Sequence, residues 1–366
     1  MKLNIDLPGG GYPVVLKSDA FAGLGASIMD ALPETTNCVV ISSKTLWPLF
    51  GEAVLQSLRG VGISGHVLVV PDGESEKSFD RWVWLVNEII ALGVDRQTPV
   101  LAVGGGVIGD LAGFVAAPVK RGLPFVQVPT SLLAMVDSSV GGKTAINTHH
   151  GKNLVGAFHQ PALVYVSIDA LEHLPQLQLE SGLGEVVKHG MLADPQLLLT
   201  CRTNRELIRQ RDVEILKELI LRSIQVKSDF VVEDERERGV RALLNLGHTV
   251  GHALEKVLMD TPNALPHGIC VAIGVLAETH WAHRLGSCSS ETVDEFEVTL
   301  VALGLPTCPP KLDAQAVLRA SGFDKKARRG KLATPIVQGV GRVILTEIDL
   351  DEIADMFYSL PGFHDA

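Results

Sequence analysis

The sequence predicts an α/β N-terminal domain built on a parallel sheet, followed by a mainly α-helical C-terminal domain. In the first half, short β-branched runs alternate with longer segments whose apolar residues recur every three or four positions. Beyond about Asp169, nearly every periodic segment is helical. The chain has 366 residues, which is more than one hydrophobic core usually serves. We expect the boundary near Leu171–Pro175, giving domains 1–172 and 173–366.

The strands expected in the first half are short and rich in β-branched residues: Val39–Ile41, His66–Val70, Val100–Val103, Phe125–Val128 and Leu163–Val166. Helices are expected over Leu46–Leu58, over Phe79–Leu92 and directly after Val103. Because strands and helices alternate, the sheet should be parallel and Rossmann-like, with helices on both faces.

In the second half, the longest amphipathic helices are expected over Val213–Val232 and Ala242–Met259. Two short strands, Pro335–Val337 and Arg342–Leu345, come late in the chain, and Leu350–Leu360 should form a closing helix.

The composition limits the possible partners. Hydrophobic residues make up 46% and the net charge is −10, so an acidic globular surface argues against nucleic acid and anionic membranes as partners. The five cysteines are scattered and form no Cys-x-x-Cys pair, which fits a reducing cytoplasm better than a disulfide framework. The N-terminus does not resemble a signal peptide, and no apolar run is long enough to span a bilayer.

Two glycine-containing segments follow predicted strands. Gly104-Gly-Gly-Val-Ile-Gly-Asp110 opens a predicted helix, where free N–H groups favour a phosphate; the alternative is a tight turn without a ligand. In Pro71–Lys77, Glu74 could accept ribose hydroxyls and Lys77 could face a phosphate, unless this is only a solvated acidic loop.

A loop rich in small residues carries two lysines, Lys143 and Lys152, with Asp137 and Asn153 beside them. This combination suits an oxyanion or phosphate clamp. Gly141-Gly-Lys-Thr144 ends like a P-loop but lacks the first glycine at the required spacing, so we reject nucleoside triphosphate hydrolysis.

Arg241, Asn245, His248 and His252 would share one face of a single helix, because they are separated by four, three and four positions. Two histidines one turn apart suit zinc, although the pattern is not the His-Glu-x-x-His of metalloproteases. Further ligands could come from His267 and from Glu185, which has Lys188 three residues later. The pattern predicts a metal site with a position open for substrate.

With these residues in view, the sequence resembles the 3-dehydroquinate synthases. The matching segments follow one another in order along most of the chain: Pro71-Asp-Gly-Glu, Gly104-Gly-Gly-Val-Ile-Gly-Asp-Leu-Ala-Gly-Phe, Arg121-Gly, Gln127-Val-Pro-Thr, Val136-Asp-Ser-Ser-Val-Gly-Gly-Lys-Thr-Ala-Ile-Asn, Gly151-Lys-Asn-Leu-Val-Gly-Ala-Phe, Glu185-Val-Val-Lys, Asp234-Glu-Arg-Glu, Leu244-Asn-Leu-Gly-His-Thr-Val-Gly-His-Ala-Leu-Glu and His267-Gly.

The resemblance implies a role for each matched residue. It implies a divalent metal, zinc or alternatively cobalt, on Glu185, His248 and His267, and makes His252 a catalytic or substrate-contacting imidazole. Implied NAD contacts are Glu74, Lys77, Gly105, Gly106, Val107, Asp110, Thr130, Ser131 and Lys152. Implied substrate contacts are Arg121, Asp137, Lys143, Lys152, Asn153, Lys188, Lys227, Arg241, Asn245, His252, Lys325 and Lys326. Lys143, Lys188, Arg241, Asn245 and His252 are the implied catalytic residues.

The implied reaction is a step of the shikimate pathway that converts 3-deoxy-D-arabino-heptulosonate 7-phosphate to 3-dehydroquinate and phosphate. It proceeds by transient oxidation by NAD, elimination of phosphate, re-reduction and intramolecular aldol closure. The resemblance further implies a cytoplasmic homodimer with its active site in the cleft between the domains. Ile269 stands where the family usually carries Glu, and Leu177-Gln178 and Ser42-Ser43 also depart from the family pattern.

Three other functions remain as alternatives. Another sugar phosphate cyclase, of the 2-deoxy-scyllo-inosose or valiolone type, would share the fold, metal and NAD. A polyol dehydrogenase of the glycerol dehydrogenase type would instead accumulate NADH. The third alternative is a non-catalytic protein that binds NAD or metal.

Overall fold

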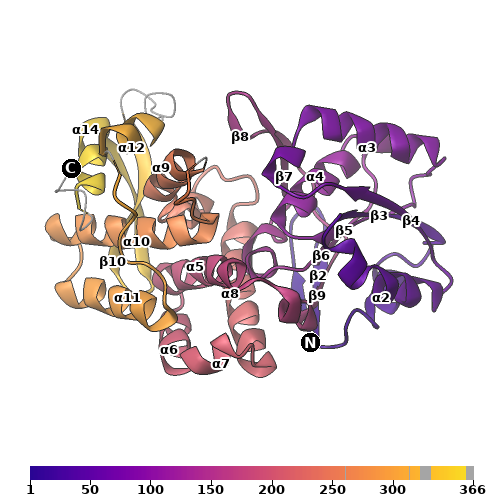
Figure 1. The fold of residues 1–366 in the computed structure, drawn as a ribbon, viewed down its shortest axis with the longest axis horizontal. Coiled ribbons are helices and arrows are strands. Elements are labelled where there is room, and N and C mark those ends of the chain that lie inside the picture. The colour runs from indigo at the N-terminus through magenta and orange to yellow at the C-terminus, as the bar shows by residue number, and fades with distance from the viewer. Residues whose placement is uncertain (260, 313, 322–330, 360–366) are drawn as a thin grey trace. The chain divides into compact units, whose positions relative to one another are not determined.

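The computed structural model describes residues 1–259, 261–312, 314–321 and 331–359. The chain divides into two compact units, Met1–Leu174 and Pro175–Ala366. In Figure 1 the first unit is coloured indigo to magenta and the second runs on to yellow.

The first unit is built on a sheet in which seven of the described strands pair in the order β1-β2-β9-β6-β5-β3-β4 (Figure 1). Their bounds are β1 Lys2–Ile5, β2 Tyr12–Lys17, β3 Asn37–Ser43, β4 Ser64–Val70, β5 Val100–Gly104, β6 Phe125–Pro129 and β9 Leu163–Ser167. The edge strand β1 is antiparallel to β2, and all other neighbouring pairs are parallel. The predicted parallel α/β sheet is confirmed, although β1 and β2, which precede Val39, were not predicted.

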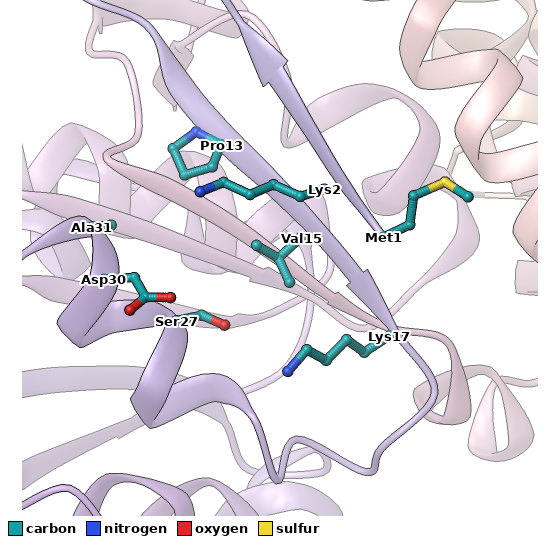
Figure 2. A pocket seen from close by; sticks show the side chains of 8 residues that line it. All are labelled: Met1, Lys2, Pro13, Val15, Lys17, Ser27, Asp30 and Ala31. Carbon is teal, nitrogen blue, oxygen red and sulfur yellow. The ribbon is translucent and has the colours of Figure 1, made fainter.

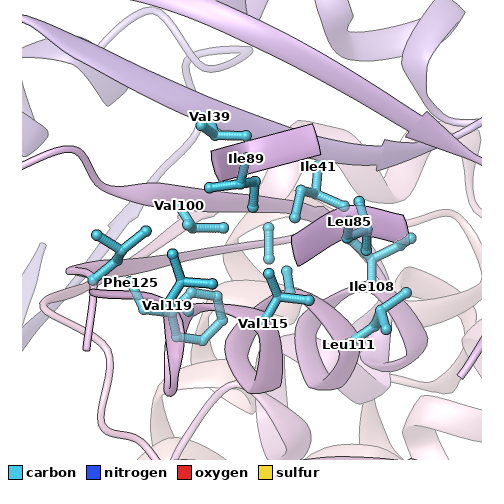
Figure 3. Packing of buried hydrophobic residues seen from close by; sticks show 14 of the residues in the cluster. Val39, Ile41, Leu85, Ile89, Val100, Ile108, Leu111, Val115, Val119 and Phe125 are labelled. Carbon is cyan, nitrogen blue, oxygen red and sulfur yellow. The ribbon is translucent and has the colours of Figure 1, made fainter. Parts of the chain in front are cut away.

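Helices cover this sheet: α1 Leu24–Ala31, α2 Trp47–Arg59, α3 Phe79–Ala91 and α4 Gly106–Ala116, with the short helices η1 Glu74–Glu76, η2 Val119–Arg121, η3 Ala134–Ser138 and η4 Ile168–His173. Figure 3 shows α3 and α4 packed on β3 and β5 through Ile89, Leu111, Val39 and Val100, all of them fully buried. Each such side chain contributes about 1.5–3 kcal/mol of hydrophobic stabilisation. This core fixes the carboxyl end of β5, where the glycine-rich turn begins.

The lysine loop is a β-hairpin. Strand β7 (Lys143–Thr148) pairs antiparallel with β8 (Gly151–Phe158), so that Lys143 lies opposite Phe158 and Thr148 opposite Gly151. The sequence predicts a loop here, because its glycines weaken the alternating pattern of a strand.

The second unit is mainly helical, as predicted. Its elements are α5 Gln176–Leu192, α6 Pro195–Thr203, α7 Arg205–Arg209, α8 Val213–Glu233, η5 Val240–Asn245, α9 His248–Leu258, α10 His267–Arg284, α11 Ser290–Leu303, α12 Ala314–Ser321, β10 Lys331–Gly339, β11 Arg342–Asp349 and α14 Leu350–Phe357. The two late strands and the closing helix were predicted. Helix α10 is buried on nearly all sides and is the centre of this unit. Among the described residues, no helix is both long and apolar enough to cross a membrane.

The helix predicted over Ala242–Met259 is wrong in its first part. Val240–Asn245 is a 3-10 segment, and Gly247 then adopts a left-handed conformation with φ of 79° before α9 begins at His248. Therefore Arg241 and Asn245 do not share a helix face with His248 and His252. Only the two histidines lie on α9.

An open pocket of about 450 Å³ lies beside β1, β2 and α1, lined by Met1, Lys2, Pro13, Val15, Lys17, Ser27, Asp30 and Ala31 (Figure 2). Its two lysines are exposed at the surface, and none of the predicted site residues lines it.

Candidate metal and cofactor sites

Three helices of the second unit each carry one of the proposed metal ligands next to a glycine. Gly184 precedes Glu185 on α5, and Gly268 follows His267 on α10. A methyl group on Gly184 would lie 2.0 Å from Gly268 O, and one on Gly268 would lie 1.8 Å from Ser181 O. The backbones of α5 and α10 therefore touch where these ligands start.

Glycine has the same role on α9. A methyl group on Gly247, the residue before His248, would lie 2.6 Å from Val271 O of α10. The left-handed conformation of Gly247 also disfavours any side chain there. Close approach of the three backbones brings Glu185, His248 and His267 together, although they are far apart in sequence.

The side chains converge on one oxygen. Glu185 is fully buried, and its Oε1 lies 3.5 Å from His267 Nε2 and 3.9 Å from His248 Nε2. Two ligand atoms that share a tetrahedral zinc ion at about 2.1 Å are separated by about 3.4 Å. The spacing is too long for good hydrogen bonds but fits ligands of one cation. Consistent with this, Glu185 Oε1 has no hydrogen-bond partner within the described residues, whereas Oε2 is paired with Lys188.

In both histidines the second ring nitrogen, Nδ1, lies at hydrogen-bond distance from an acceptor oxygen. His267 Nδ1 lies 3.0 Å from Glu255 Oε2, and His248 Nδ1 lies 3.2 Å from Leu246 O. These acceptors hold a proton on Nδ1 of each ring and turn Nε2 toward Glu185. Once Nε2 carries no proton, this is the usual arrangement around a metal-bound imidazole.

His252 also lies at this cluster. One ring nitrogen each from His248, His252 and His267 lies within 4.8 Å of the other two. The ring of His252 is 5.0 Å from that of His248 and 5.5 Å from that of His267, measured between centroids. His252 is exposed, whereas His248 and His267 are partly buried. The geometry alone allows His252 as a ligand or as a contact for substrate.

Charge and burial set the protonation states of the metal-free cluster. Burial, together with the Lys188 ammonium, holds the pKa of His248 well below its usual value. Burial also opposes protonation of His267, but Glu185 and Glu255 outweigh it and raise the pKa of His267 to about 10. Burial raises the pKa of Glu185, yet Lys188, His267 and His248 outweigh it, so this carboxylate stays ionised. The Lys188 Nζ atom lies 2.5 Å from Glu185 Oε2.

The other predicted substrate residues of this unit are mostly buried cations. Lys188, Lys227 and Arg241 are at most 7% exposed, which is rare for charged side chains. Arg241 is held by its loop, because Asp234 accepts hydrogen bonds from the N–H groups of Arg238, Gly239 and Arg241.

Three further predicted substrate residues of this unit are Asn245, Lys325 and Lys326. Asn245 is exposed and donates to Glu237 Oε1 at 2.9 Å. Lys325 and Lys326, proposed as substrate contacts in the Asp324-Lys-Lys segment, lie outside the described residues.

In the first unit, the glycine-rich turn joins β5 to α4. Gly105 is the N-cap of α4, and Thr130 N donates to Gly104 O, which ties the turn to the end of β6. A methyl group on Gly105 would lie 3.4 Å from Ser131 Oγ, and one on Gly106 would lie 3.1 Å from Ser138 Oγ. The turn and Ser131 thus lie side by side at the carboxyl ends of neighbouring parallel strands, where ligands bind in this class of sheet. Val107 is in the first turn of α4, and Thr130 is buried directly after β6.

Three more of the predicted NAD residues, Glu74, Lys77 and Asp110, form a polar cluster centred on Lys77. Its Nζ lies 2.7 Å from Asp110 Oδ2, 2.6 Å from Asn153 Oδ1 and 3.6 Å from Glu74 Oε1. Burial lowers the pKa of Lys77, but Asp110 and Glu74 outweigh it and raise the pKa. The ammonium therefore organises carboxylates around the turn and fixes Asn153 on β8.

The other predicted ligand contacts of the first unit are more exposed to solvent. Arg121, Lys143 and Lys152 are exposed, the two lysines on the β7–β8 hairpin, and Asp137 is half-buried on η3. Exposed cations on such a hairpin can take up an anionic ligand.

Comparison with known proteins identifies the class. The fold matches 2-deoxy-scyllo-inosose synthase in complex with carbaglucose-6-phosphate, NAD+ and Co2+, with a TM-score of 0.86 and 24% identity over 99% of this chain and 100% of that one. It also matches 2-epi-5-epi-valiolone synthase from Streptomyces hygroscopicus subsp. jinggangensis with NAD+ and Zn2+ bound, with a TM-score of 0.85 and 26% identity over 95% of this chain and 96% of that one. The fold is therefore that of the sugar phosphate cyclases.

The sequence comparison is narrower. Family models described as 3-dehydroquinate synthase N-terminal and 3-dehydroquinate synthase C-terminal match residues 67–181 and 182–327. The 3-dehydroquinate synthase of Caulobacter vibrioides is 41% identical over 348 residues, 94% of each chain. This chain belongs to the 3-dehydroquinate synthase family.

Proposed function

We propose that this chain converts 3-deoxy-D-arabino-heptulosonate 7-phosphate to 3-dehydroquinate and phosphate, using NAD and one divalent metal ion. The observation that carries the proposal is the convergence of His248 Nε2 and His267 Nε2 on Glu185 Oε1, in a chain that belongs to this family. Family membership also supports a cytoplasmic homodimer and a place in the shikimate pathway.

Glu185, His248 and His267 are the proposed metal ligands. One carboxylate and two imidazoles leave a coordination position open for substrate, and they suit zinc or cobalt. When bound, the ion polarises the substrate alcohol that is oxidised and lowers its pKa. Lys188 holds Glu185 Oε2, so Oε1 stays directed at the two histidines. We assign the more exposed His252 to contact with the substrate and to proton transfer.

The glycine-rich turn and the cluster around Lys77 are the proposed NAD site. NAD, when bound, supplies a reversible hydride acceptor, so the reaction has no net redox change. The N–H groups at the start of α4 would face the pyrophosphate, and Glu74 and Asp110 offer carboxylates for ribose hydroxyls. Lys77 holds both carboxylates in position.

The lysines and arginines hold the anionic ends of the substrate. Lys143 and Lys152 present exposed ammonium groups on the hairpin, and Asn153 is fixed beside them by Lys77. The buried cations Lys188, Lys227 and Arg241 provide pre-oriented charge that stabilises developing negative charge.

The test supplies the heptulosonate phosphate with NAD and zinc or cobalt, and follows phosphate and 3-dehydroquinate together. We expect equal amounts of both products and no accumulation of NADH. Accumulating NADH would indicate a polyol dehydrogenase instead. Turnover of glucose 6-phosphate, the parent of the carba analogue bound to the inosose synthase, would favour the other cyclase.

A substitution tests the ligand assignment. Glu185→Ala removes the only proposed oxygen ligand, so turnover should fall to background and bound metal should be lost, as measured by elemental analysis. Glu180→Ala on the same helix, where Glu180 accepts from Gln176, is the matched control and should keep its metal. Full metal content in the Glu185→Ala variant would refute the assignment.

A further inference from the structure

Glu278 is a buried acid with no role in the chemistry described above. It lies on α10, is 1% exposed, and its Oε2 accepts a hydrogen bond from Gly247 N at 2.7 Å. Burial raises the pKa of Glu278 to about 8. The N–H groups of Gly247, Val250 and Thr249 at the start of α9 lower this pKa, but burial outweighs them. Its Oε1 has no hydrogen-bond partner among the described residues. Burying such a group costs free energy of folding, which indicates that Glu278 has a structural or functional role.

The contact between Glu278 and the Leu246–Gly247 peptide indicates what this role is. Gly247 N and Leu246 O belong to the same peptide group. Its N–H donates to Glu278 Oε2, and its carbonyl oxygen lies 3.2 Å from His248 Nδ1. The carboxyl therefore orients, through one peptide, the acceptor that holds the proton of His248 on Nδ1.

The two proposed histidine ligands are then supported in a reciprocal way. Glu255 on α9 contacts Nδ1 of His267, the first residue of α10. Glu278 on α10 reaches His248, the first residue of α9, through the Leu246–Gly247 peptide. Each helix thus supplies the acid that fixes the histidine at the start of the other.

We propose that Glu278 is a positioning residue of the metal site, which fixes the orientation and tautomer of His248 through the Leu246–Gly247 peptide. The inference rests on the proposed function, because it takes His248 as a ligand. Both the charged and the neutral carboxyl keep an oxygen that accepts from Gly247, so the role does not depend on the charge of Glu278.

The test compares two variants at this position in the full chain. Glu278→Met removes the acceptor at similar volume, and Glu278→Gln keeps one. Affinity for Co²⁺ is measured by competition with a chelator, and the visible absorption of the bound ion reports its coordination. Loss of a group that orients a ligand typically lowers metal affinity by about 10- to 100-fold. We expect that loss with Met, a changed spectrum, and recovery to within about threefold of wild type with Gln.

Two controls separate positioning from general damage. Thr279→Val removes the neighbouring buried hydroxyl, which donates to Val275 O of its own helix, and should lower stability without changing Co²⁺ affinity. Glu255→Gln should alter the environment of the bound ion through His267. Wild-type affinity in Glu278→Met, or equal losses in the Met, Gln and Thr279→Val variants, would overturn the inference. If the wild-type chain binds no Co²⁺, the proposed metal site itself fails, which is a different result.

A measurement on the wild-type chain does not depend on how the variants fold. Nitrogen NMR of the metal-free protein should find the proton of His248 on Nδ1. A proton on Nε2 would contradict the peptide-mediated contact, whatever the variants do.

Discussion

At the scale of single residues, His267 makes metal binding depend on pH. Its pKa of about 10 in the metal-free protein means that it carries a proton at neutral pH, held by Glu185 and Glu255. A metal ion must displace that proton. We expect apparent zinc affinity to rise about tenfold for each pH unit between about pH 7 and 9, and calorimetry in buffers of different ionisation enthalpy to show about one proton released.

The control for this prediction removes one of the two acids. Glu255→Gln should lower the pKa of His267, so the rise in affinity should level off at a lower pH. The proton also stabilises the metal-free fold, because the folded pKa lies above the unfolded value. That contribution is complete below about pH 6.5 and is lost as the pH rises through about 10. A zinc affinity that is constant from pH 7 to 9 would contradict the assigned protonation state.

Which residues could be found from sequence depends on what their spacing encodes. His248 and His252 were paired correctly because one helical turn separates them. The approach of Glu185 and His267 depends on helix packing, which spacing does not encode. The residue pattern offered them only as possible further ligands, and the family resemblance implied the full ligand set. Glu255 and Glu278 received no role, because an acid on an apolar helix gives no signal until its partner on another helix is known.

At the scale of helices, the glycines beside the ligands should control the metal site. In Gly268→Ala the new methyl group would lie 1.8 Å from Ser181 O, a backbone atom that cannot move freely. Helix α10 must shift away from α5, which separates His267 from Glu185. We expect a loss of stability of about 1–3 kcal/mol, typical of overpacking, and a loss of bound zinc. Chemical denaturation and elemental analysis measure the two effects.

Gly339→Ala on β10 is the matched control, because a methyl group there meets no atom within 4 Å. It should change stability by less than about 0.5 kcal/mol and leave bound zinc unchanged. If Gly268→Ala keeps its zinc, close contact between the two backbones is not what positions the ligands.

The positions of glycines and other small residues also explain which elements could be predicted from the sequence. Helices α3 and α8 follow the apolar spacing of the sequence closely, since nothing interrupts their backbone. Helix α9 was predicted to start too early because Gly247 breaks a helical pattern that continues on both sides of it. The β7–β8 hairpin was missed because its small residues carry no clear period of two.

At the scale of the whole molecule, the two proposed half-sites lie in different units. The proposed NAD contacts all belong to Met1–Leu174, and the proposed metal ligands all belong to Pro175–Ala366. The ion pairs described above for the two half-sites lie within single units: Lys77 pairs with Asp110 in the first, and Glu185 pairs with Lys188 in the second. Without substrate, NAD and metal should therefore bind independently, while turnover should require both.

Two variants of the full chain test this independence. Lys77→Met removes the cation that orders Glu74, Asp110 and Asn153, so the Kd for NAD should rise at least tenfold while bound zinc stays at the wild-type level. Glu185→Ala should lose zinc and keep the wild-type Kd for NAD. The control variant Lys17→Met replaces an exposed lysine of the first unit. It should change neither the Kd for NAD nor the amount of bound zinc. Since a ligand that binds only the folded state raises its stability, zinc should also raise the Tm of Lys77→Met but not that of Glu185→Ala. A Lys77→Met variant that loses its zinc would show that NAD binding and metal binding are coupled. The proposal that the two units bind these ligands independently would then be wrong.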